Sequence, residues 1–146
     1  MSEPLLRIER LALALPDGAD RLYAVANVSY ELSAGEILCV VGESGSGKSM
    51  TANAVMGLLP TGVHASRGRA LFDGQDLLAM DEISHRALRG RRIGMIFQEP
   101  MTALNPLMRV GEQIAEVFEA LRLLTPRTRK EKALALLEEV RLPDPE

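Results

Sequence analysis

The chain has 146 residues, of which 47% are hydrophobic and 25% charged, and its formal net charge is −3. This composition is ordinary for a folded globular protein, and the length is enough for one compact domain with its own core. The balance of charge lacks the basic excess that attracts nucleic acids or anionic membranes. We therefore expect no nucleic-acid partner. A small phosphorylated ligand agrees better with this charge than DNA does.

The cysteine content and the N-terminal residues exclude two further features, an internal disulfide and an N-terminal targeting or membrane-spanning segment. Cys39 is the chain's one cysteine, which excludes an internal disulfide, and its apolar neighbours favour a small core residue over a redox role. The apolar N-terminal residues are interrupted by Arg7, Glu9 and Arg10. The sequence therefore predicts neither a signal peptide nor a membrane span there.

The first half of the chain is predicted to contain strands, a glycine-rich loop and a helix. Residues 4–15 and 22–32 are β-prone and separated by the turn "PDGAD", which predicts an antiparallel layer. The run "ILCVV" at 37–41 is apolar without alternation, as in a strand buried on both faces. A helix is predicted from Lys48, closed by Pro60 and Gly62, because apolar residues recur at helical spacing at Ala52, Val55, Met56 and Leu59.

The second half is predicted to become mostly helical. "RALFDGQDL" predicts a strand with an Asp73-Gly74 turn, residues 81–89 a short helix, and 92–97 another buried strand that ends at Gln98. After the loop "EPMTALNP", residues 110–124 and 128–140 are predicted to be helices. Thr128 and Glu131 have the spacing of a capping box, and one apolar stripe contains Ala133, Leu136, Leu137 and Val140.

The stretch "GESGSGKS" carries the strongest chemical signal. Its residues Gly42, Gly47, Lys48 and Ser49 fit the pattern G-x-x-x-x-G-K-[ST], and the predicted strand and helix flank it as that pattern requires. Glycines let successive backbone N–H groups point at an anion, and the helix N-terminus adds its positive dipole end. Lys48 is then expected to reach the β and γ phosphates, while the Ser49 hydroxyl holds Mg²⁺.

This loop alone does not identify a reaction. The non-functional alternative is a flexible Gly/Ser turn with a solvated lysine. Even as a phosphate-binding loop it is shared by kinases, switch GTPases and motor ATPases. No "NKxD" guanine-reading motif is present, which weighs against a GTPase. By themselves, Tyr23 would more often be a strand-edge tyrosine and Gln98 a solvated strand end.

Three features in the right order resemble the ATP-binding subunits of ABC transporters. "GESGSGKS" is similar to their phosphate loop, "IFQEPMTALNP" at 96–106 to their Q-loop region, and Tyr23, 25 residues before Lys48, to their adenine-stacking aromatic. The segments "VVGESGSGKS", "MGLLP", "MIFQEPMTALNPLMRVGEQIAEV" and "PDPE" look like the oligopeptide/dipeptide importer branch, which includes glutathione and nickel importers. The resemblance covers essentially the whole chain.

The resemblance implies an α/β fold with a P-loop NTPase (RecA-like) core. Residues 1–98 would form this nucleotide-binding core with its antiparallel β layer, and 99–146 the start of a helical subdomain. Gln98 would contact Mg²⁺ and the attacking water, and together with Lys48 it is the predicted catalytic pair. The predicted nucleotide-binding residues are Tyr23, Gly42, Glu43, Ser44, Gly45, Ser46, Gly47, Lys48, Ser49 and Met50; those for Mg²⁺ are Ser49 and Gln98.

The implied partners are a second ATP-binding subunit, as a homo- or heterodimer, and membrane-spanning permease subunits. The helical region would dock on the permease, with the subunit peripheral on the cytoplasmic face of the plasma (inner) membrane. Two ATP molecules would be sandwiched between the subunits, and Gln98 would sense the γ-phosphate and shift the helices. The transported solute is set by other subunits.

Two departures from the family pattern limit this expectation. Position 50 is Met where many ABC loops carry a Thr on the α-phosphate, and Thr51 should point elsewhere on the helix, so binding is expected to be modestly weaker. The sequence also contains no LSGGQ-like signature, no strand ending in Asp-Glu and no switch histidine; His64 and His85 are expected at the surface. The chain is therefore interpreted as an N-terminal portion that binds ATP without hydrolysing it. The alternatives are a stand-alone nucleotide-binding module and another P-loop enzyme, such as a small kinase.

Overall fold

The computed structural model describes residues 3–98, 104–120 and 125–142. The chain divides into two compact units, Met1–Arg89 and Gly90–Glu146, and each is described by itself. The boundary expected between residues 98 and 99 stays a prediction. No helix in the described ranges is both long and apolar enough to cross a membrane.

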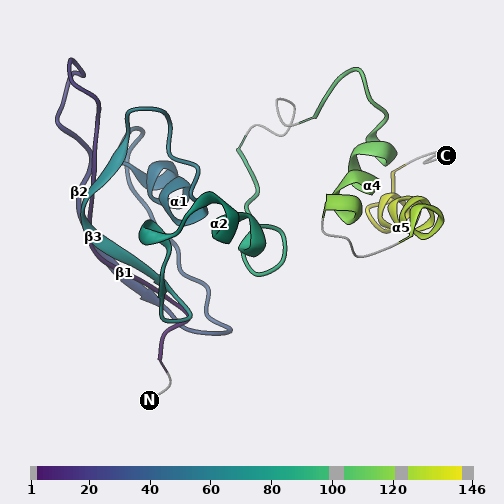
Figure 1. The fold of residues 1–146 in the computed structure, drawn as a ribbon, viewed down its shortest axis with the longest axis horizontal. Helices are drawn as coiled ribbons and strands as arrows, with labels where there is room; N and C mark the ends of the chain where they lie inside the picture. Colours follow the sequence, from purple (N-terminus) through teal and green to yellow (C-terminus); the bar gives the residue numbers. More distant parts are fainter. Residues whose placement is uncertain (1–2, 99–103, 121–124, 143–146) are drawn as a thin grey trace. The chain divides into compact units, whose positions relative to one another are not determined.

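An antiparallel sheet forms one layer of the first unit (Figure 1). Its strands are β1 (Leu6–Ala14), β2 (Tyr23–Leu32), β3 (His64–Phe72) and β4 (Gln75–Asp76), in the order β2-β1-β3-β4. All three pairings are antiparallel, and β3 and β4 are joined through Asp73 and Gly74. The predicted N-terminal layer and the Asp73-Gly74 turn are confirmed.

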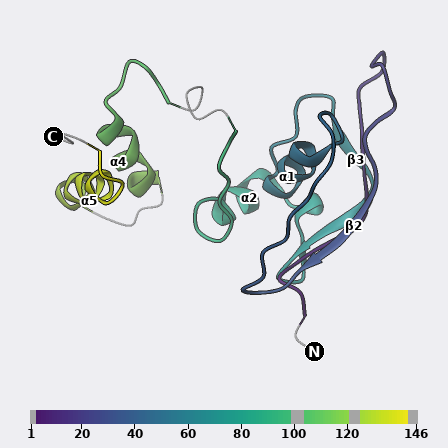
Figure 2. The ribbon, with the colours of Figure 1, turned by 180° about the vertical axis from the view of Figure 1, so that it is seen from behind.

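The helices of the first unit lie on one side of this sheet, as the two opposite views show (Figures 1 and 2). They are α1 (Lys48–Met56), the short 3-10 helix η1 (Leu77–Ala79) and α2 (Glu82–Leu88). Sheet and helices bury a shared set of apolar side chains, which are Ile8, Leu11, Ala12, Leu13, Ala24, Val25, Ala54, Val55, Met56, Ala70, Phe72 and Leu77. This core holds the N-terminus of α1 against β2.

The two apolar runs predicted to be buried strands are not strands in the structure. Residues 37–41 and 94–97 have no regular secondary structure, Ile37 is 94% exposed, Ile96 is 97% exposed, and Cys39 is exposed rather than in the core. Gln98 therefore does not stand at the end of a strand. An apolar run becomes a buried strand only when other strands bond its edges and other layers cover its faces. In the described residues every strand lies in the antiparallel sheet, and none of them pairs with either segment.

The end of α1 and the environment of His85 also differ from expectation. The helix stops before Gly57, whose left-handed backbone lets its N–H and that of Leu58 bond back to the last turn, so Pro60 and Gly62 do not close it. His64 is exposed as predicted. His85 is not: it is 6% exposed, and its Nε2 lies 2.8 Å from the carbonyl oxygen of Leu77. The ring lies against the Leu77 carbonyl of η1 and against Gly57 at the end of α1, and no local pattern specifies these contacts.

Arg89 joins the ends of α1 and α2. Its Nε donates to the Met56 carbonyl at 2.8 Å and its Nη2 to the Gly57 carbonyl at 3.0 Å, while Nη1 donates to Glu82 at 2.7 Å. The cation therefore satisfies carbonyls left open at the C-terminus of α1, where a positive charge is favourable. The hydrogen bond from Arg89 holds the pKa of Glu82 below its usual range.

Replacing Arg89 by alanine is expected to lower the free energy of unfolding by about 1–3 kcal/mol, because two carbonyls lose a charged donor. The Arg86→Ala variant, which alters an exposed arginine of the same helix, serves as the control in urea unfolding. Glu82 adds stability that is present above its unfolded pKa and lost as the pH falls through its folded pKa. The Arg89 variant should therefore lose less stability on acidification; equal stability of the two variants would contradict the capping role.

The second unit is a helical hairpin. Its helices are α4 (Val110–Ala120) and α5 (Pro126–Glu139), which are joined by an ion pair between Arg129 and Glu119. The helical prediction is confirmed for the described residues, but α5 begins earlier: Thr125 caps it, its hydroxyl accepting from the Thr128 N–H. Thr128 therefore lies inside the first turn. Ala133 and Leu137 of the predicted stripe are buried, whereas Val140 is exposed.

Candidate functional site: an anion-binding loop at a helix N-terminus

The glycine-rich loop leads directly into α1. The helix begins at Lys48, and Gly47 occupies the N-cap position with φ 94°, without any side-chain cap. The first N–H groups of a helix have no partner within the helix, so this terminus presents donors and a positive dipole end at the loop. The loop and helix parts of the predicted strand-loop-helix unit are confirmed, and the strand part is wrong.

Gly47 is held against β2. A Cβ at this position would lie 2.6 Å from the Ala24 carbonyl oxygen and 2.7 Å from Val25 Cγ2, closer than real Cβ contacts. A Cβ on Gly42 would meet the Ser46 hydroxyl oxygen at 2.7 Å. Gly47 therefore permits the loop to pack closely on β2, and Gly42 lets it pack on the Ser46 side chain.

Lys48 curls back over the loop. Its ammonium donates to the carbonyl oxygens of Gly42 at 2.6 Å and Glu43 at 2.7 Å, and lies 3.3 Å from the Ser46 hydroxyl oxygen. Both carbonyls are neutral acceptors in an exposed loop. Phosphate oxygens are stronger, charged acceptors for an ammonium group, so a phosphorylated ligand in the loop would give Lys48 better partners.

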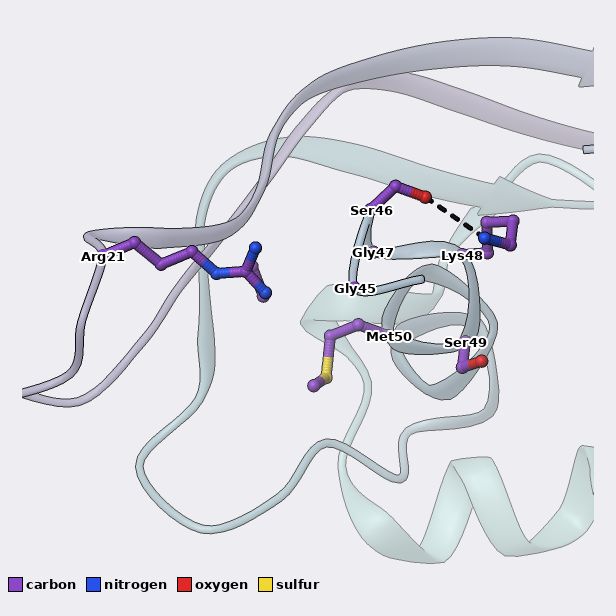
Figure 3. A pocket seen from close by; sticks show the side chains of 8 residues that line it. Arg21, Gly45, Ser46, Gly47, Lys48, Ser49 and Met50 are labelled. Carbon is purple, nitrogen blue, oxygen red and sulfur yellow. Dashed lines mark hydrogen bonds between the residues drawn. The ribbon is translucent and has the colours of Figure 1, made fainter. Parts of the chain in front are cut away.

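A cavity of about 180 Å³ lies beside the loop (Figure 3). Its walls combine the β2 end of the sheet with the loop and the first turn of α1; they are Arg21, Ala24, Gly45, Ser46, Gly47, Lys48, Ser49 and Met50. Six of the predicted binding residues, Gly45 to Met50, therefore meet at one hollow. Gly42, Glu43 and Ser44 are exposed residues of the same loop outside these walls.

Tyr23 is the first residue of β2 and is 42% exposed. It is outside the cavity walls, although its neighbour Ala24 belongs to them. An exposed aromatic side chain next to a wall residue of the hollow suits stacking of a flat base, and the stacking role stays a prediction. Sequence reasoning missed Arg21, although it lies only two residues before Tyr23, and that spacing was the available signal.

Gln98 belongs to the second unit and is exposed. Its contact with Mg²⁺ and water stays a prediction, because the two units are described separately. The following segment is tied to α4: the Gln113 side chain accepts from the Asn105 N–H at 2.8 Å and donates to the Asn105 carbonyl at 2.9 Å and the Met108 carbonyl at 3.0 Å. Residues 99–103 of the predicted Q-loop region lie outside the described residues.

The side chains of the first turn of α1 point in different directions, and Thr51 points away from the hollow as expected. Thr51 is buried, and its hydroxyl donates to the Gly47 carbonyl at 3.0 Å, so it points away from the hollow as predicted. Met50 lines the cavity with an apolar side chain. In Figure 3, Lys48 and Ser49 lie on one side of the helix start, and Met50 faces Arg21 on the other.

These residues fit a nucleotide phosphate chain with magnesium. The uncapped helix start, Lys48 and the two tight glycines form a cradle for an anion, and the exposed Ser49 hydroxyl can be one magnesium ligand. Among the described residues no group of three or more His, Cys, Asp or Glu side chains could hold a metal by itself. Mg²⁺ commonly takes few protein ligands and shares phosphate oxygens and water, so such a set is unnecessary here.

A family model described as "ABC transporter" matches residues 25–146 of the chain. Among curated relatives, the chain is 46% identical over 99% of its length to the probable D,D-dipeptide transport ATP-binding protein DdpD of Escherichia coli (strain K12), covering 44% of that protein. It is 43% identical over 97% of its length to the oligopeptide transport ATP-binding protein OppD of Bacillus subtilis (strain 168), covering 40%. It is 45% identical over 99% of its length to the peptidoglycan transport ATP-binding protein YejF of Agrobacterium fabrum, covering 27%. The chain thus spans less than half the length of these relatives.

Solved structures give the same assignment of the fold. The dimeric structure of MJ0796, a bacterial ABC transporter cassette, matches with a TM-score of 0.79 at 23% identity, over 95% of this chain and 58% of that one. The structure of cbiO1 from Clostridium perfringens, part of the cbiONQ transporter complex, matches with a TM-score of 0.66 at 22% identity, over 97% of this chain and 52% of that one. The described antiparallel sheet and helices are thus part of a P-loop NTPase fold of the cassette type.

Proposed function

The chain belongs to the ABC transporter family, and we propose that it supplies the ATP-binding, energy-coupling part of an importer whose solute is a peptide. The observation that carries the proposal is the loop at the start of α1, where the described partners of Lys48 are all neutral acceptors beside an uncapped helix terminus. The names of the relatives, which describe dipeptide and oligopeptide transport, support the choice of solute.

Each part of the site has a task in this proposal. Tyr23 stacks on adenine, and backbone N–H groups from Gly45 to Met50 donate hydrogen bonds to the phosphate oxygens in the hollow. Lys48 would exchange its carbonyl partners for the β and γ phosphate oxygens, and the Ser49 hydroxyl would be a ligand of Mg²⁺, whose positive charge would neutralise the phosphates. Because Lys48 and Mg²⁺ would both interact with the β and γ phosphates, binding is expected to be strongest for a nucleotide that carries both of these phosphates.

The second unit couples this site to its partners. Gln98 senses the γ-phosphate and contacts Mg²⁺ and water, and α4 and α5 dock on membrane-spanning permease subunits at the cytoplasmic face. The bonds between Gln113 and Asn105 support this role, since they attach the segment after residue 103 firmly to α4. A second ATP-binding subunit, identical or different, completes the assembly and would sandwich two ATP molecules.

We further propose that these 146 residues bind Mg-ATP without turning it over. The printed sequence has no LSGGQ-like signature, no strand ending in an Asp-Glu pair and no histidine after Gln98. A general base that activates water and donors aimed at the developing charge supply most of the acceleration in such a reaction. A stand-alone binding module remains an alternative, as does a small kinase.

Isothermal titration of the purified chain with ATP in the presence and absence of Mg²⁺ tests this proposal. We expect saturable, magnesium-strengthened binding, no release of phosphate, and no transfer of phosphate to small acceptors. Absence of ATP binding by a chain that unfolds cooperatively would refute the nucleotide site. Phosphate release would refute the claim of no turnover, and phosphoryl transfer would favour the kinase.

A further inference from the structure

Arg21 is placed in the nucleotide site by the structure and by no motif. It precedes β2 and forms part of the cavity wall together with residues 45–50. Its side chain extends toward the loop and Met50, on the side of the helix start away from Lys48 (Figure 3). We infer that Arg21 is a nucleotide-binding residue whose guanidinium contacts the phosphate nearest the ribose, an inference that rests on the proposed function.

The guanidinium of Arg21 is available for such a contact. It makes no ion pair or hydrogen bond with the residues that the structure describes, whereas Arg7 and Arg69 pair with Glu9 and Arg89 pairs with Glu82. Exposed arginines without partners also occur elsewhere on the surface, so availability alone does not indicate a ligand. What distinguishes Arg21 is that its unpaired charge faces a hollow that also contains the N-terminus of α1.

The arrangement of the site selects which phosphate Arg21 meets. Lys48 sits over the loop carbonyls of Gly42 and Glu43, and Arg21 approaches the same helix start from the opposite side. Tyr23, two residues along the chain at the start of β2, is the residue proposed to stack on the base. In the proposed function the base lies at Tyr23 and the distal phosphates at Lys48, and Arg21 is the cation in the cavity wall on the side away from Lys48, which makes the phosphate nearest the ribose its expected partner.

Met50 makes a second cation useful at this point. Its side chain lines the hollow but has no N–H or O–H to donate, so position 50 offers a phosphate only its backbone N–H. A guanidinium supplies several donors in a planar fork that matches phosphate oxygens. Arg21 thereby compensates for the apolar side chain at position 50.

Affinities of ATP, ADP and AMP for the Arg21→Gln variant test this inference. All three nucleotides should bind about five- to twenty-fold more weakly, by a similar factor, because all three carry the phosphate nearest the ribose. The difference should shrink at high salt, since the site is exposed. Arg67→Gln is the matched control: it removes the same charge from an exposed position of β3 outside the cavity wall and should leave all three affinities unchanged.

The outcomes separate this inference from the proposed function. Unchanged affinity of Arg21→Gln, in a wild-type chain that binds ATP, overturns the role of Arg21 and leaves the proposed function standing. A loss confined to ATP also overturns it, because that result would place Arg21 on the terminal phosphate. Arg21→Lys should restore part of the affinity; a lysine variant as weak as the glutamine variant counts against a charge contact. Failure of wild-type binding refutes the proposed function itself.

Discussion

Replacing Lys48 by alanine should weaken ATP binding by about ten- to a hundred-fold, which corresponds to roughly 1.5–3 kcal/mol for hydrogen bonds to a charged group. In the unliganded loop this ammonium bonds to the carbonyl oxygens of Gly42 and Glu43, which are exposed and can be hydrated when it is removed. The free energy of unfolding should therefore change by less than about 1 kcal/mol. Loss of affinity without loss of stability is the expected signature of a ligand-binding lysine.

Titration calorimetry with ATP and with AMP provides the measurement for this variant. Because Lys48 is proposed to hold the β and γ phosphates, affinity for AMP should fall much less than affinity for ATP. The Arg21→Gln variant, in contrast, should lose affinity for both nucleotides by a similar factor. Lys132→Ala removes one positive charge from α5 in the other unit and is the control for nonspecific electrostatics. Equal ATP affinity of Lys48→Ala and Lys132→Ala would refute the role assigned to the loop.

Replacing Gly47 by alanine should lower the free energy of unfolding by about 2–4 kcal/mol and abolish measurable ATP binding. Two costs add: a Cβ strains a residue at φ 94°, and it also meets the Ala24 carbonyl oxygen at 2.6 Å. To relieve this collision the loop must move away from β2, which displaces its backbone N–H groups from the hollow. The site is thus lost together with the packing that holds it.

Gly45 is a matched control for Gly47 within the same loop. It has φ 78°, but nothing lies within 4 Å of a Cβ placed there, so Gly45→Ala bears only the backbone strain, about 1–2 kcal/mol. Urea unfolding of both variants should separate strain from collision. Equal destabilisation by the two substitutions would show that contact with β2 does not set the loop's position.

Much of the fold follows from local patterns. β-prone composition and turn residues predicted β1 and β2 as an antiparallel pair, and the periodic apolar residues after Lys48 predicted α1. The start of α5 was misplaced by two residues because Thr125 and Thr128 both suit a cap, and only the backbone shows that Thr125 is the one that accepts a hydrogen bond. Local chemistry therefore specified the type of each helix better than its ends.

The candidate site divides in the same way. The spacing of Gly42, Gly47, Lys48 and Ser49 predicted the loop, because these residues lie close together in the sequence and form one local motif. Arg21 escaped notice because an arginine in a turn has no signature until the fold brings it to the cavity. The predicted role of Gln98 stays open for a related reason: it depends on how two separate units approach each other.

The sequence by itself determined the family, the glycine-rich loop and the helix behind it, since these depend on residues close together in the chain. Only the tertiary structure decided that 37–41 and 94–97 are irregular and largely exposed, that His85 is buried, and that Arg21 faces the same hollow as Met50. Burial is a property of what packs against a segment. An apolar run states a preference for burial, and whether partners satisfy it depends on residues distant in the chain.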